Sequence, residues 1–110
     1  MILYAESSAV AAWVLGEPRS AEIARIVGAS ERVLASWLTI VECERAVVRR
    51  GADLSNKERV AARGMLAEFR ERWTLFEIDG AIRNRSAEPF PIEPIRTLDA
   101  LHLATLLEAG

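Results

Sequence analysis

The sequence has one cysteine, one histidine and no long run of uncharged apolar residues. The single Cys43 excludes an intramolecular disulfide, and with only His102 beside it a thiolate zinc site lacks ligands. Because no stretch of about 18 apolar residues is present, no transmembrane helix is expected. The N-terminus also lacks the basic, apolar and small-residue pattern of a secretory signal, so the cytoplasm is the expected location.

Neither positive nor negative charge is in large excess. The sequence has 14 Lys and Arg against 16 Asp and Glu, with a formal net charge of −2. This balance argues against bulk, nonspecific nucleic-acid binding, which shows as an excess of basic residues. It does not exclude a nuclease, whose centre is itself acidic. The length of 110 residues predicts a single domain over residues 1–110.

Apolar segments alternate with helix-forming segments, which predicts one α/β domain around a parallel sheet. Strands are expected at residues 1–5, 32–36 and 73–78. A first helix is expected to run to residue 15, with Ser7 or Ser8 as its N-cap. Further helices are expected at residues 18–28, 39–51 and 98–108, and others are expected to begin at 55 and after 80. The buried side of the long helix after residue 55 is expected to consist of Val60, Met65, Leu66 and Phe69. Residues 88–95, with three prolines, are expected to form a loop.

Three acidic residues fall near the expected ends of strands or starts of helices. Glu6 directly follows the first strand, and ligands bind beyond the carboxyl ends of strands in open parallel sheets. Glu42 and Asp99 each lie in the first turn of an expected helix. Carboxylates that converge repel one another unless a cation neutralises them, and oxygen ligands suit Mg²⁺ or Mn²⁺. Such an ion generates hydroxide from bound water and stabilises a pentavalent phosphate.

Each acid also has a purely structural explanation. Glu42 lies three residues after Thr39, and this capping-box spacing alone accounts for a glutamate. Asp99 near the start of a helix is favoured by the helix dipole. Glu6 could be an ordinary loop acid or a partner of the first helix N-terminus. Spacing alone therefore leaves both interpretations open.

Three segments resemble the PIN-domain family, specifically the VapC toxins of bacterial toxin–antitoxin pairs. Residues 2–10 (ILYAESSAV) resemble its opening strand and acidic turn, and residues 38–42 (LTIVE) resemble its second motif. Residues 95–104 (IRTLDALHLA) resemble the third motif and are the most specific of the three. The order and spacing of these segments cover nearly the whole chain.

The resemblance implies an α/β/α sandwich around a parallel sheet and Mg²⁺- or Mn²⁺-dependent hydrolysis of RNA. It assigns Glu6, Glu42 and Asp99 as the catalytic and metal-binding acids, with the hydroxyl of Ser8 supporting the metal site. The family also implies three partners, namely an RNA substrate, a small antitoxin that covers the acidic cleft and a second copy of the chain.

The sequence departs from the family pattern at two points. The first acid is Glu6 where aspartate is usual. The family also continues past the third motif with a strand that carries a fourth acid, so we expect a PIN-like domain without its C-terminal strands. Asp79 and Glu93 precede the third motif and do not match the fourth acid. Residues 2–5 would then form an apolar sheet edge, which we expect another chain to cover.

Several other reactive side chains favour structural interpretations. His102 lies one helical turn after Asp99, and a packed or hydrogen-bonded histidine is favoured over a metal ligand. The three tryptophans stand at apolar positions, so core or interface burial is favoured over stacking on RNA bases. Cys43 is expected to be a small buried residue.

The leading interpretation is a Mg²⁺-dependent endoribonuclease toxin. Two rivals remain. The first is a catalytically weak PIN domain that binds RNA or the antitoxin without cleaving, which the absent fourth acid favours. The second is a structural dimer in which the acids serve only as helix caps. The RNA target is not readable from the sequence, because loop contacts choose it.

Overall fold

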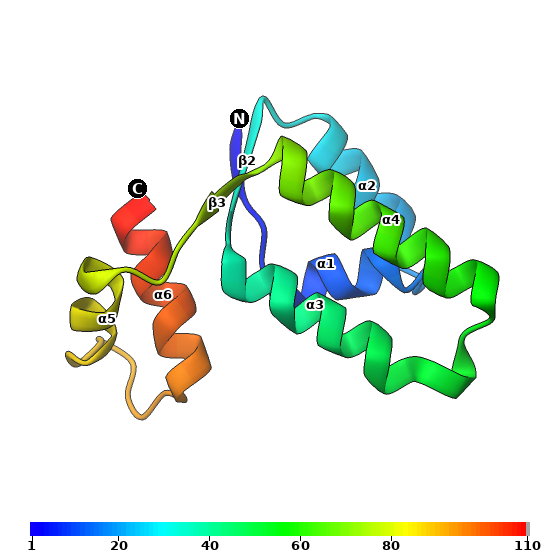
Figure 1. Ribbon diagram of the computed structural model, residues 1–110. Helices are drawn as coiled ribbons and strands as arrows, with labels where there is room; N and C mark the ends of the chain where they lie inside the picture. Colours follow the sequence, from blue (N-terminus) through cyan, green and yellow to red (C-terminus); the bar gives the residue numbers. More distant parts are fainter. Residues whose placement is uncertain (110) are drawn as a thin grey trace.

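A parallel three-stranded sheet separates two groups of helices in the computed structural model, which describes residues 1–109 (Figure 1). The strands are β1 (Ile2–Tyr4), β2 (Arg32–Ser36) and β3 (Thr74–Phe76). The helices are α1 (Ser7–Val14), α2 (Ser20–Gly28), α3 (Trp37–Arg50), α4 (Asn56–Arg72), α5 (Gly80–Ser86) and α6 (Thr97–Ala109), with a 3-10 turn, η1 (Gly51–Asp53). The predicted α/β class with a parallel sheet is confirmed. Within residues 1–109, none of the helices is long and apolar enough to cross a membrane.

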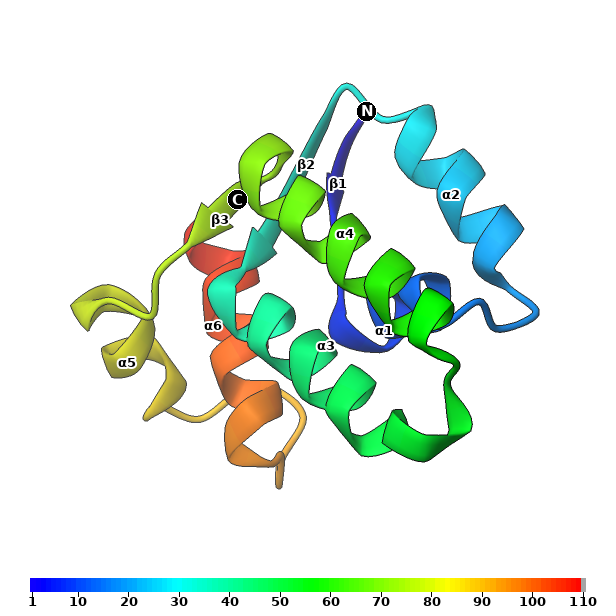
Figure 2. The ribbon, with the colours of Figure 1, turned by 45° about the vertical axis from the view of Figure 1, so that its right-hand side comes forward.

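The sheet has the order β1-β2-β3, with β1 at an edge. Leu3 of β1 stands opposite Val33 of β2, and Leu34 of β2 stands opposite Thr74 of β3. Helices α1 to α4 lie on one side of the strands, and α5 and α6 lie on the other (Figure 2). The expected exposed edge at β1 is therefore present in the described chain.

The apolar side chains form two separate clusters. The main core lies between β1, β2 and the helices α1, α3 and α4, and it consists of Ala5, Val10, Val14, Val33, Ala35, Ile40, Cys43, Val47, Leu54, Ala62, Leu66 and Phe69. A smaller cluster belongs to α5, the following loop and α6, and it consists of Ile82, Phe90, Ala100 and Ala104. The α5–α6 region thus has a small core of its own.

Helix α4 begins where its sequence predicts. The amide of Ser55 donates to Glu58 Oε1 at 2.8 Å, and the amide of Glu58 donates to Ser55 Oγ at 3.1 Å, which completes a capping box. The predicted burial of Phe69 is confirmed, but that of Val60 is wrong, because Val60 is 64% exposed. The buried face follows Ala62, Leu66 and Phe69, and Val60 lies two residues from Ala62, on another side of the helix.

Helix α3 begins earlier than predicted. It starts at Trp37, and its N-cap is Ser36, whose Oγ accepts from the amide of Leu38 at 3.1 Å. Because Ser36 is also the last residue of β2, the strand passes directly into the helix without a loop. The predicted capping box between Thr39 and Glu42 is therefore wrong. Glu42 lies in the second turn, so capping does not explain it.

The tryptophans pack against the main core, as predicted. The Trp13 and Phe69 ring centroids are 4.8 Å apart, and Trp73 stacks on Phe69 with centroids 4.2 Å apart. The guanidinium of Arg70 lies 5.4 Å from the ring centroid of Trp37. These rings stabilise the packing of α1, α3 and α4.

The predicted burial of Cys43 is confirmed, and it leads to a prediction about reactivity. Burial, together with the charges of Glu42, Glu6 and Glu44, raises the pKa of the Cys43 thiol from 9.0 to about 12. Because the thiolate is the reacting form, we expect iodoacetamide at pH 8 to label the folded chain far more slowly than the urea-unfolded chain. Mass spectrometry measures the labelling. Equal labelling rates with and without urea would contradict the expectation.

The same pKa shift makes stability depend on alkaline pH. The unfolded chain loses the Cys43 proton near the ordinary pKa of 9.0, whereas the folded chain keeps it to about 12. The free energy of unfolding therefore falls as the pH rises between these two values, because the unfolded state alone gains from deprotonation.

Candidate active site

One pocket brings the three predicted acids together. It has a volume of about 540 Å³ and is lined by Tyr4, Glu6, Ser7, Ser8, Glu42, Asp99, His102, Leu103 and Leu106. These residues come from the end of β1, from α1, from α3 and from α6. Since both β1 and β2 end here, the pocket lies at the carboxyl edge of the sheet, where ligands bind in folds of this class.

Glu6 is held by the start of α1. Its Oε1 accepts hydrogen bonds from the amides of Ser8 and Ala9, the latter at 3.1 Å, and the Ser8 hydroxyl donates to its Oε2 at 2.9 Å. Burial acts to raise the pKa of Glu6, but these hydrogen bonds outweigh it and hold the pKa below its usual value. Glu6, and neither Ser7 nor Ser8 as predicted, is the N-cap of α1. The alternative explanation of Glu6 as a cap partner is confirmed.

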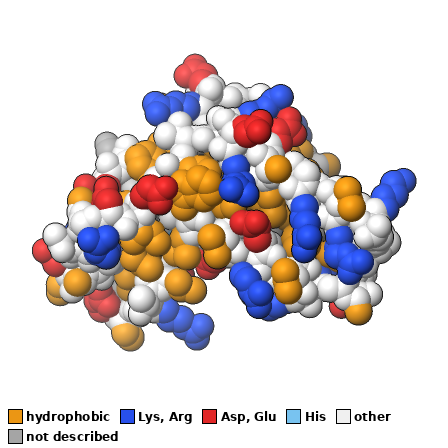
Figure 3. Space-filling model, viewed as in Figure 1, with side chains coloured by type: hydrophobic (Ala, Val, Ile, Leu, Met, Phe, Trp, Pro, Cys, Tyr) orange, Lys and Arg blue, Asp and Glu red, His pale blue; other side chains and the backbone are white. Residues whose placement is uncertain are grey.

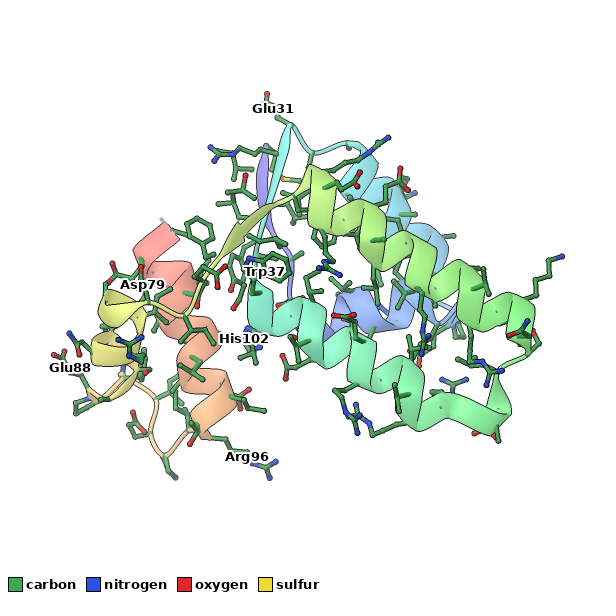
Figure 4. All side chains as sticks on the ribbon, viewed as in Figure 1. Glu31, Trp37, Asp79, Glu88, Arg96 and His102 are labelled. Carbon is green, nitrogen blue, oxygen red and sulfur yellow. The ribbon has the colours of Figure 1, made fainter. Side chains whose placement is uncertain are left out.

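Glu42 is held by two side chains from other helices. Its Oε1 accepts from Ser7 Oγ at 2.6 Å and lies 2.6 Å from His102 Nε2. Figure 4 shows His102 on α6, between this helix and α3. Ser7 Oγ is also 3.3 Å from His102 Nε2. The interpretation of His102 as a hydrogen-bonded helix histidine is confirmed. The role of Ser7 was missed, because a serine beside Ser8 gives no signal of its own.

Asp99 is exposed and lies in the first turn of α6. Its position agrees both with the helix-dipole explanation and with a place among the acids of the pocket. Within residues 1–109, its carboxylate accepts no side-chain hydrogen bond and forms no ion pair. Asp99 is thus the acid of the pocket whose side chain is least constrained.

The donor chemistry of the pocket fits a hard divalent cation. Carboxylate and hydroxyl oxygens dominate the polar lining, and such oxygens are the ligands that Mg²⁺ and Mn²⁺ prefer. In the described part of the chain, however, no three His, Cys, Asp or Glu side chains are close enough together to hold one ion. Binding by all three acids therefore requires side chains to move, and convergence on one ion stays a prediction.

Comparisons with known proteins agree with this architecture. The chain aligns in structure with the VapC20 toxin of Mycobacterium tuberculosis, which cleaves the sarcin-ricin loop. The TM-score is 0.66 at 14% sequence identity, and the alignment covers 100% of this chain and 84% of that one. At this identity the likeness concerns the fold. No curated protein matches the sequence.

A family model gives the remaining evidence. The model of the PIN domain matches residues 3–110, a range that includes all three acids of the pocket. The match thus covers almost the whole chain and agrees with the parallel sheet, the helices on its two sides and the acidic pocket at the carboxyl ends of its strands. The chain belongs to the PIN domain family.

Proposed function

We propose that the protein is a metal-dependent endoribonuclease toxin of the VapC type, acting in the cytoplasm. The observation that carries the proposal is the pocket that Glu6, Glu42 and Asp99 line together, although they come from separate parts of the chain. For Glu42 in particular the capping explanation is lost, since Ser36 and not Thr39 caps its helix. Helix capping does not explain three acids around one pocket, whereas carboxylate oxygens are ligands that Mg²⁺ prefers.

Six side chains of the pocket have a role in this proposal. Glu6, Glu42 and Asp99 would hold the cation, which when bound supplies a hydroxide from water and stabilises charge on the scissile phosphate. The Ser8 hydroxyl fixes the Glu6 carboxylate, and Ser7 with His102 fixes that of Glu42. The reaction is hydrolysis of an RNA phosphodiester, in which water attacks phosphorus in line with the leaving oxygen.

Basic side chains on α3 and α4 support an RNA substrate. Arg45 and Arg49 of α3 and Arg63 and Arg70 of α4 are exposed. Figure 3 shows blue side chains over these two helices, in the right half of the view. Although the net charge of the chain is −2, the helix that carries Glu42 has a locally basic face. Phosphate groups are attracted to such a face.

A catalytically weak PIN domain is the alternative function. The absence of a three-acid cluster within residues 1–109 favours it, because a preformed site would gather its ligands before the ion arrives. In this case the chain binds RNA or an antitoxin without cleaving. The purely structural dimer is less well supported, since Glu6 forms a side-chain cap but Glu42 lies in the second turn of a helix that Ser36 caps.

An RNA-cleavage assay tests the proposal. The chain is incubated with a structured RNA in the presence of Mg²⁺, of Mn²⁺ or of EDTA, and the products are separated by electrophoresis. Cleavage that needs the metal supports the ribonuclease. RNA binding without cleavage, measured by gel shift, supports the alternative. If the chain neither binds nor cleaves the RNA, both candidate functions are contradicted.

We expect the free edge of β1 to be covered in solution. Among residues 1–109 the strand has one neighbour in the sheet, and its Ile2 and the preceding Met1 are 60% and 62% exposed. An apolar edge with unpaired backbone groups pairs readily with another strand. Light scattering at micromolar concentration is expected to give a dimer, or a complex where the antitoxin is present. A monomer whose β1 amides exchange slowly would contradict this prediction.

A further inference from the structure

Residues 79–109 pack on the sheet as a unit, and few large apolar side chains of α6 are buried. This α5–α6 unit has its own small core, separate from the main one. The buried side chains of α6 are the small Ala100, Ala104 and Thr105, while its larger Leu98, Leu103, Leu106 and Leu107 are exposed. Since apolar stabilisation scales with the area removed from water, packing alone gives α6 a weak hold on the rest of the chain.

The hydrogen bonds described between this unit and helices α1 and α3 pass through His102. Its Nε2 lies 2.6 Å from Glu42 Oε1 on α3 and 3.3 Å from Ser7 Oγ on α1. Arg83 Nη1 also donates to the carbonyl of Ile78, which directly precedes the unit, at 3.1 Å. The other hydrogen bonds described for residues 79–109 stay inside the unit. The Tyr4 hydroxyl lies beside Thr105 but has no hydrogen-bond partner in the described part of the chain. One imidazole therefore makes the polar link from α6 to α1 and α3.

The geometry at Nε2 shows what His102 does there. An ionised carboxylate only accepts hydrogen bonds, so a nitrogen 2.6 Å from Glu42 Oε1 must carry a proton and donate it. A donating Nε2 has no lone pair for a cation, and Nδ1 is buried without a partner in the described residues. In this arrangement Nε2 is engaged by Glu42 and Ser7, so His102 holds Glu42. Ser7 donates to the same Oε1, and no hydrogen bond described within residues 1–109 reaches Oε2.

We propose that His102 is a positioning residue that docks α6 on α1 and α3 through Glu42, and so keeps Asp99 at the acidic pocket. Asp99 precedes His102 by one helical turn, so a histidine fixed to Glu42 also fixes the distance between the two acids. The docking depends only on the contacts described above. The effect of this docking on cation binding rests on the proposed function.

The test compares His102→Leu, which removes the hydrogen bond, with His102→Gln, which keeps a side-chain N–H. Leu107→Ala, at an exposed position of the same helix, is the control. Mn²⁺ affinity is measured by electron paramagnetic resonance, and amide hydrogen exchange by mass spectrometry. Residues that orient metal ligands typically change affinity about 10–100-fold, so we expect a loss of that size in His102→Leu. Exchange should accelerate in α6 but not in α4, and His102→Gln should restore both properties.

Several outcomes overturn the inference. They are unchanged α6 exchange in His102→Leu, acceleration that includes α4 equally, and a His102→Gln variant as impaired as His102→Leu. An effect of Leu107→Ala equal to that of His102→Leu also overturns it. If the unaltered chain neither binds Mn²⁺ nor cleaves RNA, the proposed function fails, and the exchange pattern with its rescue by glutamine still decides the docking role.

Discussion

Replacement of Asp99 by asparagine is expected to abolish metal-dependent RNA cleavage, with a fall in rate of about a hundredfold or more. The substitution keeps the shape of the side chain and removes one negative charge from the pocket that would hold the cation. Loss of one electrostatic contact to a transition state costs about 10²–10³ in kcat. Because Asp99 is exposed and its side chain has no partner within residues 1–109, the fold should tolerate the change. Initial cleavage rates with Mg²⁺ and with Mn²⁺ measure the effect.

Glu108→Gln provides the matched control for this substitution. Glu108 is exposed on the same helix, α6, but lies outside the pocket. The Glu108→Gln substitution removes the same unit of charge, so a general electrostatic effect on RNA binding would lower both cleavage rates alike. We expect the Glu108→Gln variant to cleave RNA at the rate of the unaltered chain. A folded Asp99→Asn variant that cleaves as fast as the control would exclude Asp99 from the reaction.

A stability measurement separates lost chemistry from lost folding. Asp99 lies in the first turn of α6, where a negative charge interacts favourably with the helix dipole. Its neutralisation should lower the free energy of unfolding by only about 0.3–1 kcal/mol. Thermal melting followed by circular dichroism tests this, and a large loss of stability would assign Asp99 a structural role instead.

That the three acids line one pocket was predictable, because it depends on local patterns in a fixed order. An apolar strand followed by Glu6 predicted the carboxyl edge of a parallel sheet, and β2 occupies the expected residues 32–36. The start of α3 was not predictable in the same way. Both Ser36 and Thr39 are good N-caps, and the direct passage of β2 into the helix selected Ser36. That choice depends on how the strand meets the core.

The contacts that hold Glu42 lay beyond sequence reasoning for a different reason. Ser7 and His102 are 95 residues apart, and neither belongs to a pattern that indicates the other. The cap of α1 was mistaken because serine is a common N-cap, whereas Glu6 has the extended backbone, with ψ of 151°, that a cap requires. Side-chain partners thus follow from the packed arrangement of α1, α3 and α6.

Replacement of Ile40 by alanine is expected to lower the free energy of unfolding by about 2–5 kcal/mol. Ile40 is on α3, has 0% exposure and belongs to the main core. Its truncation removes buried methyl groups and leaves a cavity between the sheet and the helices. Small domains have a total stability of about 5–15 kcal/mol, so the loss is a large fraction of it. Urea unfolding followed by tryptophan fluorescence measures the change.

Val41→Ala is the control, because Val41 is the next residue of α3 and is 51% exposed. Surface changes of this kind usually stay within about 0.5 kcal/mol. Equal losses for Ile40→Ala and Val41→Ala would show that the assigned core face of α3 is wrong, and with it the direction in which Glu42 is presented. Since Glu42 contacts Ser7 and His102 rather than Ile40, folded Ile40→Ala protein should still keep the geometry of the pocket. Cleavage per folded molecule, measured well below the melting temperature, should therefore survive a substitution that removes much of the stability.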